Sequence, residues 1–224
     1  LTEGPVGCAV LDQKGMILDA EKSGIFRIDP RTKEKQLMAK AHDDERIRYN
    51  DGKLDPKGRL LVGTMGYDDT YEGKAALYAI EKDGTVRTVL DGLTLANGMG
   101  WSPDGKTLYF IDTPTQKVGS YAYDPETGEA IFEKYVIEIT DGSNPDGMCV
   151  DMEGMIWVAQ YGGEKVCRWD PESGGKLEEI RMPVKNVTSC CLGGENLEYL
   201  YITTAKDGET QEALAGGLFR VKLS

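Results

Sequence analysis

Four oxygen-bearing side chains recur at nearly constant spacing along the chain. Glu3, Asn50, Asn97 and Asp146 are separated by 47, 47 and 49 residues, and each precedes a glycine-containing start of a predicted strand. If this spacing reflects a structural repeat, the four side chains occupy the same position in successive units and converge. Converging carboxylates and amides repel or stay unsatisfied without a positive partner. The pattern therefore predicts a site for a hard divalent cation, Ca²⁺, Mg²⁺ or Mn²⁺, with Zn²⁺ left open.

A simpler interpretation exists for each of these positions taken alone. Asn-Gly and Asp-Gly pairs are good turn formers, so any one of the four side chains could serve only to make a bend. The occurrence of four such side chains at the same position of the repeat favours the cation site. The single histidine, His42, lies in a charged stretch and is predicted to be an exposed loop residue. Most hydrolytic triads and zinc sites use histidine, so the predicted chemistry depends on oxygen ligands and carboxylates.

The elements that must position these residues are short strands repeating every 40 to 50 residues. Asp-Gly-type turns, each followed by a short apolar run, mark the repeat, and Asp-Pro turns mark a second hairpin in three units. Each unit reads as four strands, which is one blade of a propeller. The fifth unit, from 188 to 221, is degenerate. The first turns are Asp12–Gly15, Asp55–Gly58, Ser102–Gly105 and Asp151–Gly154, and the Asp-Pro turns begin at Asp29, Asp124 and Asp170.

We therefore expect an all-β chain, a β-propeller with five recognisable blade repeats, forming a single domain over residues 1–224. A β-sandwich is the less favoured alternative because sandwiches lack so regular a period.

Composition limits the partners. With 26 basic against 38 acidic residues the net charge is −12, which disfavours nucleic acid as a partner. No apolar run approaches the roughly 20 residues of a membrane helix, and no signal peptide is recognised, so no membrane partner is expected. The five cysteines lack CxxC spacing and are predicted to be reduced thiols, which indicates a cytoplasmic location.

Several strings together resemble the SMP-30/gluconolactonase/regucalcin family of six-bladed propellers. The resemblance covers nearly the whole chain, up to Gly216–Phe219. The matching strings are Arg48–Pro56, Gly63–Met65, Asn97–Gly105, Pro145–Cys149 and Thr188–Cys191.

The resemblance implies a metal-dependent lactonase. Asn97 and Asp146 match metal ligands, with Asp146 also near the scissile carbonyl, where it would take the proton of the attacking water. Arg48 and Asn50 match substrate-contacting positions, although a surface salt bridge is the simpler interpretation of Arg48. Asp68 falls where the family often places a carboxylate for sugar hydroxyls.

One departure from the family concerns the start of the chain. Members usually carry a further blade that supplies a third metal ligand, the glutamate of a Glu-x-Pro-x-Trp string. Here Glu3-Gly4-Pro5-Val6 is similar, but Gly7-Cys8 stands where tryptophan is expected. Either the chain is truncated, so that the first blade is missing, or five units form the ring and Glu3 replaces the missing ligand. An unclosed blade edge would invite self-association, and the oligomeric state stays open.

The expected function is opening of a small-molecule sugar lactone, as in gluconolactonase. Two alternatives stay open: phosphotriester or aryl-ester hydrolysis at the same cation, and a non-catalytic calcium-binding propeller.

Overall fold

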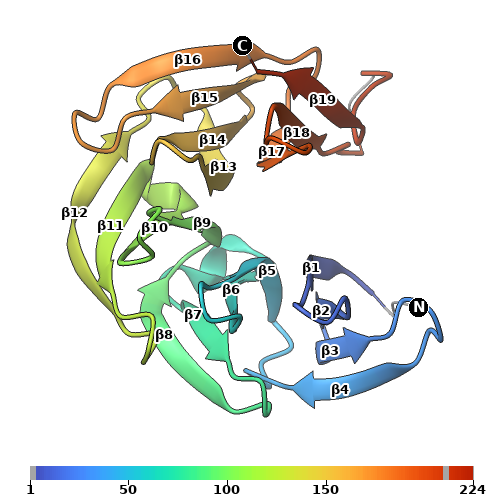
Figure 1. Cartoon of the computed structure of the whole chain (residues 1–224). Helices are drawn as coiled ribbons and strands as arrows, with labels where there is room; N and C mark the ends of the chain where they lie inside the picture. Colours follow the sequence, from blue (N-terminus) through green and yellow to red (C-terminus); the bar gives the residue numbers. More distant parts are fainter. Residues whose placement is uncertain (1–3, 209–211, 224) are drawn as a thin grey trace. The chain divides into compact units, whose positions relative to one another are not determined.

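The computed structural model describes residues 4–208 and 212–223, and its regular structure is almost entirely antiparallel strand. Four sheets have four strands and the last has three, in sequence order within each sheet (Figure 1). This repeated meander is the blade of a β-propeller, which confirms the predicted fold class and the five repeats.

The bounds of the strands follow the predicted units. They are β1 Val6–Leu11, β2 Ile17–Glu21, β3 Gly24–Ile28 and β4 Lys35–Ala39; β5 Ile47–Leu54, β6 Leu60–Gly66, β7 Ala75–Ile80 and β8 Val86–Leu93; β9 Ala96–Trp101, β10 Thr107–Asp112, β11 Lys117–Tyr123 and β12 Ala130–Glu138; β13 Asn144–Val150, β14 Ile156–Tyr161, β15 Lys165–Trp169 and β16 Lys176–Arg181; β17 Val187–Gly193, β18 Tyr199–Thr204 and β19 Leu218–Lys222.

Three of the turns between the first two strands of a blade share one hydrogen-bond pattern. The carboxylate of Asp12 accepts from the backbone N–H groups two and four residues later, at 2.8 and 2.9 Å. Asp55 and Asp151 make the same pair of bonds at 2.9 to 3.0 Å. The glycine that completes each turn has positive φ, for example 81° at Gly58, which favours glycine. A side chain thus closes each bend locally, which is why the sequence predicts these turns.

The first strands of four blades carry a recurrent irregularity. The register shifts between Tyr49 and Gly52 in β5 and between Pro145 and Met148 in β13. Similar shifts occur between Val6 and Cys8 in β1 and at Thr188 in β17. Each shift is a β-bulge, which leaves an extra residue outside the ladder and redirects its side chain.

The bulges correct one prediction. Asn50, Asn97 and Asp146 lie inside β5, β9 and β13, and not just before these strands. The first and last of these strands have continuous ladders on both sides of the polar residue. Asn-Gly and Asp-Gly dipeptides suggested a turn, but tertiary pairing placed them within strands, at bulges in β5 and β13.

The chain divides into two compact units, one of Leu1–Asn97 with Ala122–Ile131 and the other of Gly98–Tyr121 with Phe132–Ser224. In the first unit, buried side chains of β2, β3, β5, β6 and β7 form an apolar core that includes Leu18, Ile25 and Leu60. In the second, Trp157 and Val166 pack against Leu200 and Ile202. A second cluster there joins Ile111 and Val118 to Ile156 and Val158. A single domain over 1–224 stays a prediction.

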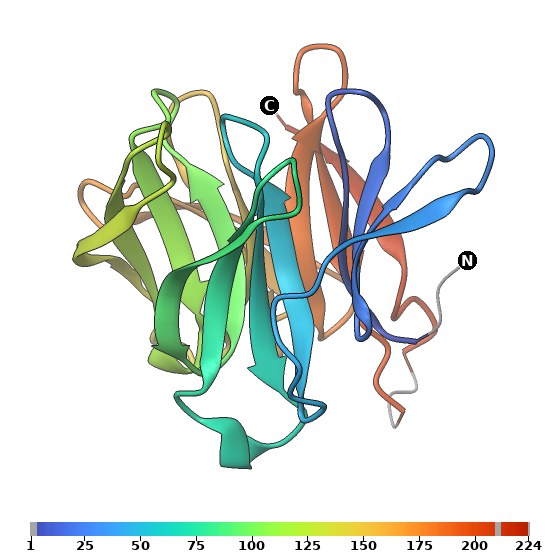
Figure 2. The same cartoon turned by 90° about the horizontal axis from the view of Figure 1, so that it is seen from below.

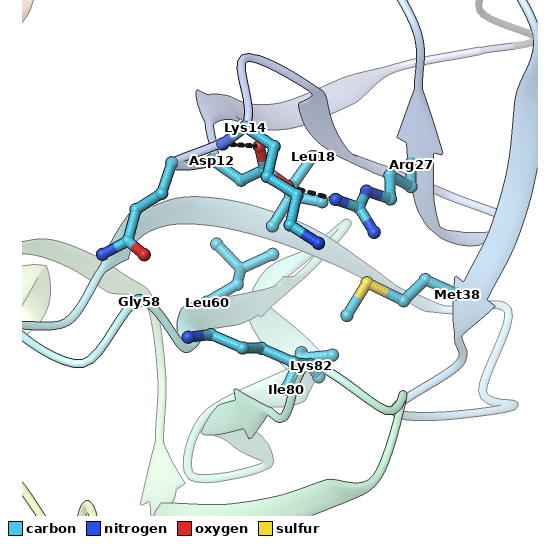
Figure 3. A pocket seen from close by; sticks show the side chains of 10 residues that line it. Asp12, Lys14, Leu18, Arg27, Met38, Gly58, Leu60, Ile80 and Lys82 are labelled. Atoms are coloured by element: carbon cyan, nitrogen blue, oxygen red, sulfur yellow. Dashed lines mark hydrogen bonds and ion pairs between the residues drawn. The ribbon is translucent and has the colours of Figure 1, made fainter.

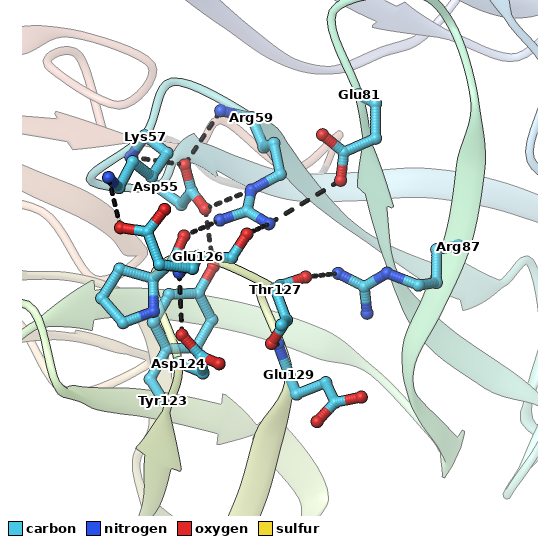
Figure 4. Close-up of polar contacts among 11 residues, drawn as sticks. Asp55, Lys57, Arg59, Glu81, Arg87, Tyr123, Asp124, Glu126, Thr127 and Glu129 are labelled. Carbon is cyan, nitrogen blue, oxygen red and sulfur yellow. Dashed lines mark hydrogen bonds and ion pairs between the residues drawn. The ribbon is translucent and has the colours of Figure 1, made fainter.

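A buried ionic cluster within the first unit joins two distant turns (Figure 4). The Nε of Arg59 donates to Asp55 Oδ2 at 2.8 Å, and its Nη2 and Nη1 donate to the carbonyls of Pro125 and Glu126. The hydroxyl of Tyr123 donates to the same Asp55 oxygen at 2.7 Å. The side chains of Arg59 and Asp55 are 6% and 0% exposed. The turn before β6 is therefore tied to the turn that precedes β12.

A second buried polar group lies on β2. Asp19 and Glu21 are 2% and 1% exposed, and Lys35 Nζ is 2.6 Å from Glu21 Oε1. Asp19 Oδ1 has no hydrogen-bond partner within the described ranges. Burial, followed by the neighbouring Glu21, raises the pKa of Asp19 to about 6. Two carboxylates therefore compete for one lysine.

The cysteines are free thiols, as predicted, and Cys149, Cys167 and Cys190 are buried. His42, in contrast, is not an exposed loop residue as predicted. Its ring is half-buried with its centroid 4.9 Å from that of Tyr49, and burial lowers its pKa.

Helical structure in the described ranges is limited to two short 3₁₀ turns. The first, η1 Asp69–Tyr71, lies in the loop at one end of β6 and β7 (Figure 2). The second, η2 Thr113–Thr115, follows β10. No helix of the described residues is long and apolar enough to cross a membrane.

Candidate functional site

Arg48 and Asn50 lie together on β5 in the first unit. The Nη1 of Arg48 donates to the carbonyl of Tyr49 at 3.0 Å and to Oδ1 of Asn50 at 3.1 Å. The amide nitrogen of Asn50 donates to the carbonyl of Ala96 at 3.0 Å. Since Asn50 falls in the β5 bulge, its side chain is available for this contact. The structure therefore brings two predicted site residues together and connects them to β9.

Asn97 follows Ala96 on β9 and is only 5% exposed. The neighbouring strand β6 approaches closely because Gly63 has no side chain: a Cβ there would lie 2.5 Å from the Cβ of Ala96. Gly63 begins the Gly63–Met65 string noted in the sequence. The three residues Arg48, Asn50 and Asn97 thus belong to one unit.

Asp146 belongs to the second unit and lies in the β13 bulge. Its backbone is packed tightly, because a Cβ on Gly147 would lie 2.2 Å from Ser189 Oγ and one on Gly98 would lie 2.4 Å from the carbonyl oxygen of Asp146. The preceding carbonyl, of Pro145, accepts a hydrogen bond from Thr113 Oγ1 at 2.9 Å. These contacts fix the backbone that carries the carboxylate.

Three polar residues near Asp146 were missed in the sequence. Burial raises the pKa of Tyr161, and the carboxylates of Asp207 and Asp146 add to this effect. Tyr161 pairs across a β-bridge with Asn186, which is 4% exposed. Asn186 donates from Nδ2 to Asp207 Oδ2 at 3.0 Å. Asp207 and Tyr161 are far apart in sequence and carry no motif, so only the fold associates them with Asp146.

Asp68 is exposed and acts as the N-cap of η1. Its carboxylate accepts hydrogen bonds from the backbone N–H of Thr70, at 2.9 Å, and from the hydroxyl of Thr70. These two bonds lower the pKa of Asp68. A local capping role accounts for this carboxylate, and its predicted contact with a sugar stays a prediction.

Glu3 lies outside the described residues. The register of β1 places its bulge at Gly7, between Val6 and Cys8. A Cβ on Gly7 would lie 2.5 Å from the backbone of Tyr49, so no side chain fits there. The equal spacing that pointed to Glu3 therefore does not coincide with the bulge position, and its role as a ligand stays a prediction.

The donor chemistry of Asn97 and Asp146 suits a hard cation, because an amide oxygen and a carboxylate are both oxygen ligands. Within the described residues, no group of three or more histidine, cysteine, aspartate or glutamate side chains is arranged to hold a metal ion. A cation site built only from those four residue types is therefore absent from that part of the chain. The predicted site would instead need the asparagine amide and Glu3.

The chain can now be compared with known proteins. The sequence profile of the family described as the SMP-30/Gluconolactonase/LRE-like region matches residues 1–206. Regucalcin of Danio rerio is 38% identical over 218 residues, which cover 96% of this chain and 73% of that protein.

Solved structures agree with this match. A calcium-binding protein, regucalcin, of Agrobacterium tumefaciens has a TM-score of 0.89 at 27% identity, covering 97% of this chain and 76% of that one. A luciferin-regenerating enzyme has a TM-score of 0.88 at 26% identity, covering 99% and 78%. With the profile match over most of its length, the chain belongs to the SMP-30/gluconolactonase/LRE-like family.

Proposed function

We propose that the protein is a divalent-metal-dependent hydrolase that opens sugar lactones. The observation that supports this most is the pair Arg48 and Asn50, which is hydrogen-bonded to the carbonyl next to Asn97. In the second unit, the carbonyl of Asp146 lies against Gly98, the residue that follows Asn97 in the chain. Convergence of the Asn97 and Asp146 side chains is part of the proposal.

Glu3, Asn97 and Asp146 would hold the cation through oxygen atoms. When bound, the cation would polarise the ester carbonyl and lower the pKa of a bound water. The Asp146 carboxylate would accept a proton from the attacking water while the oxygen of that water forms a bond to the carbonyl carbon. The ring C–O bond would then break, the ring oxygen would receive the proton that Asp146 took from the water, and the hydroxy acid would leave.

Arg48 and Asn50 would orient the substrate. A guanidinium held by a backbone carbonyl and an amide has little rotational freedom, so its direction is set before a ligand arrives. Such a group suits the several hydroxyl and carbonyl oxygens of a sugar lactone. The hydroxyl of Tyr161, beside Asp146, is a further candidate for contact with a substrate hydroxyl.

A calcium-binding protein without ester turnover is the second candidate. It is favoured by the solved structure of similar fold that is described as a calcium-binding protein. The two candidates share the ligands and differ only in catalysis.

The decisive experiment compares Asp146→Asn with the matched control Asp91→Asn, a change at an exposed aspartate on β8. Acid release from gluconolactone and calorimetric Ca²⁺ binding are measured on each protein, before and after chelation. We expect Asp146→Asn to lower kcat about 10²- to 10⁴-fold, as loss of a general base does. The control should keep both properties.

The outcomes separate the candidates. Full lactonase activity in Asp146→Asn that also survives chelation contradicts the proposed mechanism. Calcium binding by the wild-type protein without turnover of any lactone or aryl ester supports the second candidate.

A further inference from the structure

A cavity of about 190 Å³ lies within the first unit, between the β1–β4 sheet and the β5–β8 sheet (Figure 3). Its floor is apolar, formed by Leu18, Met38, Leu60 and Ile80. Leu18, Leu60 and Ile80 belong to the buried core and are at most 5% exposed. The cavity is thus an opening into the core that shares no residue with the candidate lactonase site.

The rim of this cavity is cationic. Lys14, Arg27 and Lys82 line it together with a single carboxylate, Asp12. Arg27 Nη2 donates to Asp12 Oδ2 at 2.6 Å, while Asp12 Oδ1 accepts from the backbone of its own turn. Three positive charges against one negative charge are unusual in a chain of net charge −12.

The charges of the rim are only partly compensated within the described chain. No ion pair of the described residues involves the ammonium of Lys14 or Lys82, and Arg27 Nε is shielded from solvent without a hydrogen-bond partner there. Lys82 lies across Gly58, where a Cβ would be 3.7 Å from its Nζ. Figure 3 shows Lys14 and Arg27 on one side of the cavity and Lys82 on the other. An anion at the rim would meet positive charge from both sides.

The size of the apolar part restricts the ligand. An engineered apolar cavity of about 150 Å³ holds one benzene molecule. The volume of about 190 Å³ therefore accommodates one six-membered ring and a small polar group. A sugar does not suit the aliphatic floor, because its hydroxyls would lose hydrogen bonds to water.

We propose that this cavity binds a small aromatic carboxylate, with the ring on Leu18, Leu60 and Ile80 and the carboxylate between Lys14, Arg27 and Lys82. The ring is bound by burial of apolar surface, and the carboxylate by charge-assisted hydrogen bonds. Both parts of the ligand are needed, since exposed lysines alone bind anions weakly.

Benzoate is the probe for the test. Its binding to the full chain is followed by ¹H–¹⁵N NMR, with the amides of Leu18, Gly58, Leu60 and Ile80 as reporters. We expect saturable shifts confined to these amides and their neighbours. The double variant Lys14→Met/Lys82→Met should raise the Kd at least about tenfold, which corresponds to about 1.4 kcal/mol.

A matched control removes the same number of charges elsewhere. Lys106→Met/Lys134→Met changes two exposed lysines in another blade, and its Kd for benzoate should stay within about twofold of the wild-type value. A second variant, Met38→Trp, fills the cavity and should abolish the shifts while the cationic rim is kept.

Two further ligands distinguish the contributions. Benzamide, which keeps the ring and lacks the charge, and inorganic phosphate, which lacks the ring, should each bind at least about tenfold more weakly than benzoate. The proposal is overturned if benzoate shifts do not saturate, if they map away from the cavity, or if the double lysine variant binds as the wild type does. Phosphate binding as tight as benzoate would indicate a simple anion site and would also overturn it.

Discussion

Two arginines of the first unit, Arg48 and Arg59, illustrate the difference between a site residue and a structural one. Arg59 is 6% exposed, and acceptors from Asp55, Pro125 and Glu126 surround its guanidinium. Arg48 is half-buried and donates to the carbonyl of the next residue and to Asn50.

The two arginines differ in what their partners join. Two acceptors of Arg59, the carbonyls of Pro125 and Glu126, lie 66 and 67 residues away, so its contacts connect distant turns. The acceptors at Tyr49 and Asn50 lie within two residues of Arg48 on its own strand and orient its side chain. Loss of Arg59 should therefore affect stability, and loss of Arg48 should affect ligand binding.

The largest effect is expected for Arg59→Met. Removing the guanidinium leaves the Asp55 carboxylate buried without its cation, which typically costs about 3–5 kcal/mol. Urea unfolding measures the change in the free energy of unfolding. Arg87→Met is the matched control, because Arg87 donates to the Thr127 carbonyl of the same loop and forms no ion pair with a carboxylate among the described residues. Equal destabilisation by the two variants would contradict the structural role assigned to Arg59.

Arg48→Met is expected to act on catalysis. We predict a loss of about 10- to 100-fold in kcat/KM for gluconolactone, or about 1.4–2.7 kcal/mol, with a change of less than ~1 kcal/mol in the free energy of unfolding. Steady-state kinetics and urea unfolding of the same preparation provide the test. A stability loss as large as that of Arg59→Met would reverse the comparison.

Tyr123→Phe isolates one bond of the Arg59 cluster. The Tyr123 hydroxyl is the second donor to Asp55 Oδ2, and its loss should cost about 1–2 kcal/mol of unfolding free energy. Tyr135→Phe, at a side chain 52% exposed, serves as control and should change stability by less than ~0.5 kcal/mol. No difference between the two variants would show that Arg59 alone satisfies Asp55.

The smallest effect is expected at Asp19, where polar groups are incompletely compensated. Its pKa in the folded chain is about 6, above the ordinary value of 3.8, so between these pH values the folded chain binds more protons than the unfolded chain. The contribution of Asp19 to stability should therefore decrease as the pH rises from about 4 to about 6, and the penalty should persist above that range.

Asp19→Asn removes this titration. We expect it to flatten the pH dependence of stability and to raise the free energy of unfolding above pH 7 by about 1 kcal/mol. This increase is smaller than the full pKa shift of Asp19 would give at ~1.4 kcal/mol per pH unit. Thermal unfolding at pH 4, 5, 6 and 7 measures this. A stability difference between Asp19→Asn and the wild type that stays constant from pH 4 to pH 7 would contradict the raised pKa.

The fold was predictable because its signals are local. Asp12, Asp55 and Asp151 close their turns with hydrogen bonds to residues two and four positions later, so a short sequence window contains the whole interaction. The repeat of these turns, together with the Ser102–Gly105 turn and the degenerate fifth unit, predicted five blades. Their strands pair with near neighbours in sequence, which required no long-range inference.

The site was only partly predictable because its contacts are not local. The resemblance identified Arg48 and Asn50, and the structure brings these two together. The bulges were missed, because a register shift depends on pairing with the next strand and not on the dipeptide. Asp207, Asn186 and Tyr161 were missed for the same reason, since the contacts among them connect β14 with the loops around β17 and β18.

The bulges in the first strands of the blades have a consequence for how the family can diversify. A bulged residue contributes nothing to the regular ladder on either side, so exchanging its side chain leaves the pairing of the blade intact. Asn50 can therefore change identity without disturbing the ladder of its blade, although its bond to the Ala96 carbonyl is lost, while Gly7 cannot change, because the Tyr49 backbone occupies the space of its missing side chain. New substrate preferences can thus arise by single substitutions at some blades, and the first described blade is closed to that route.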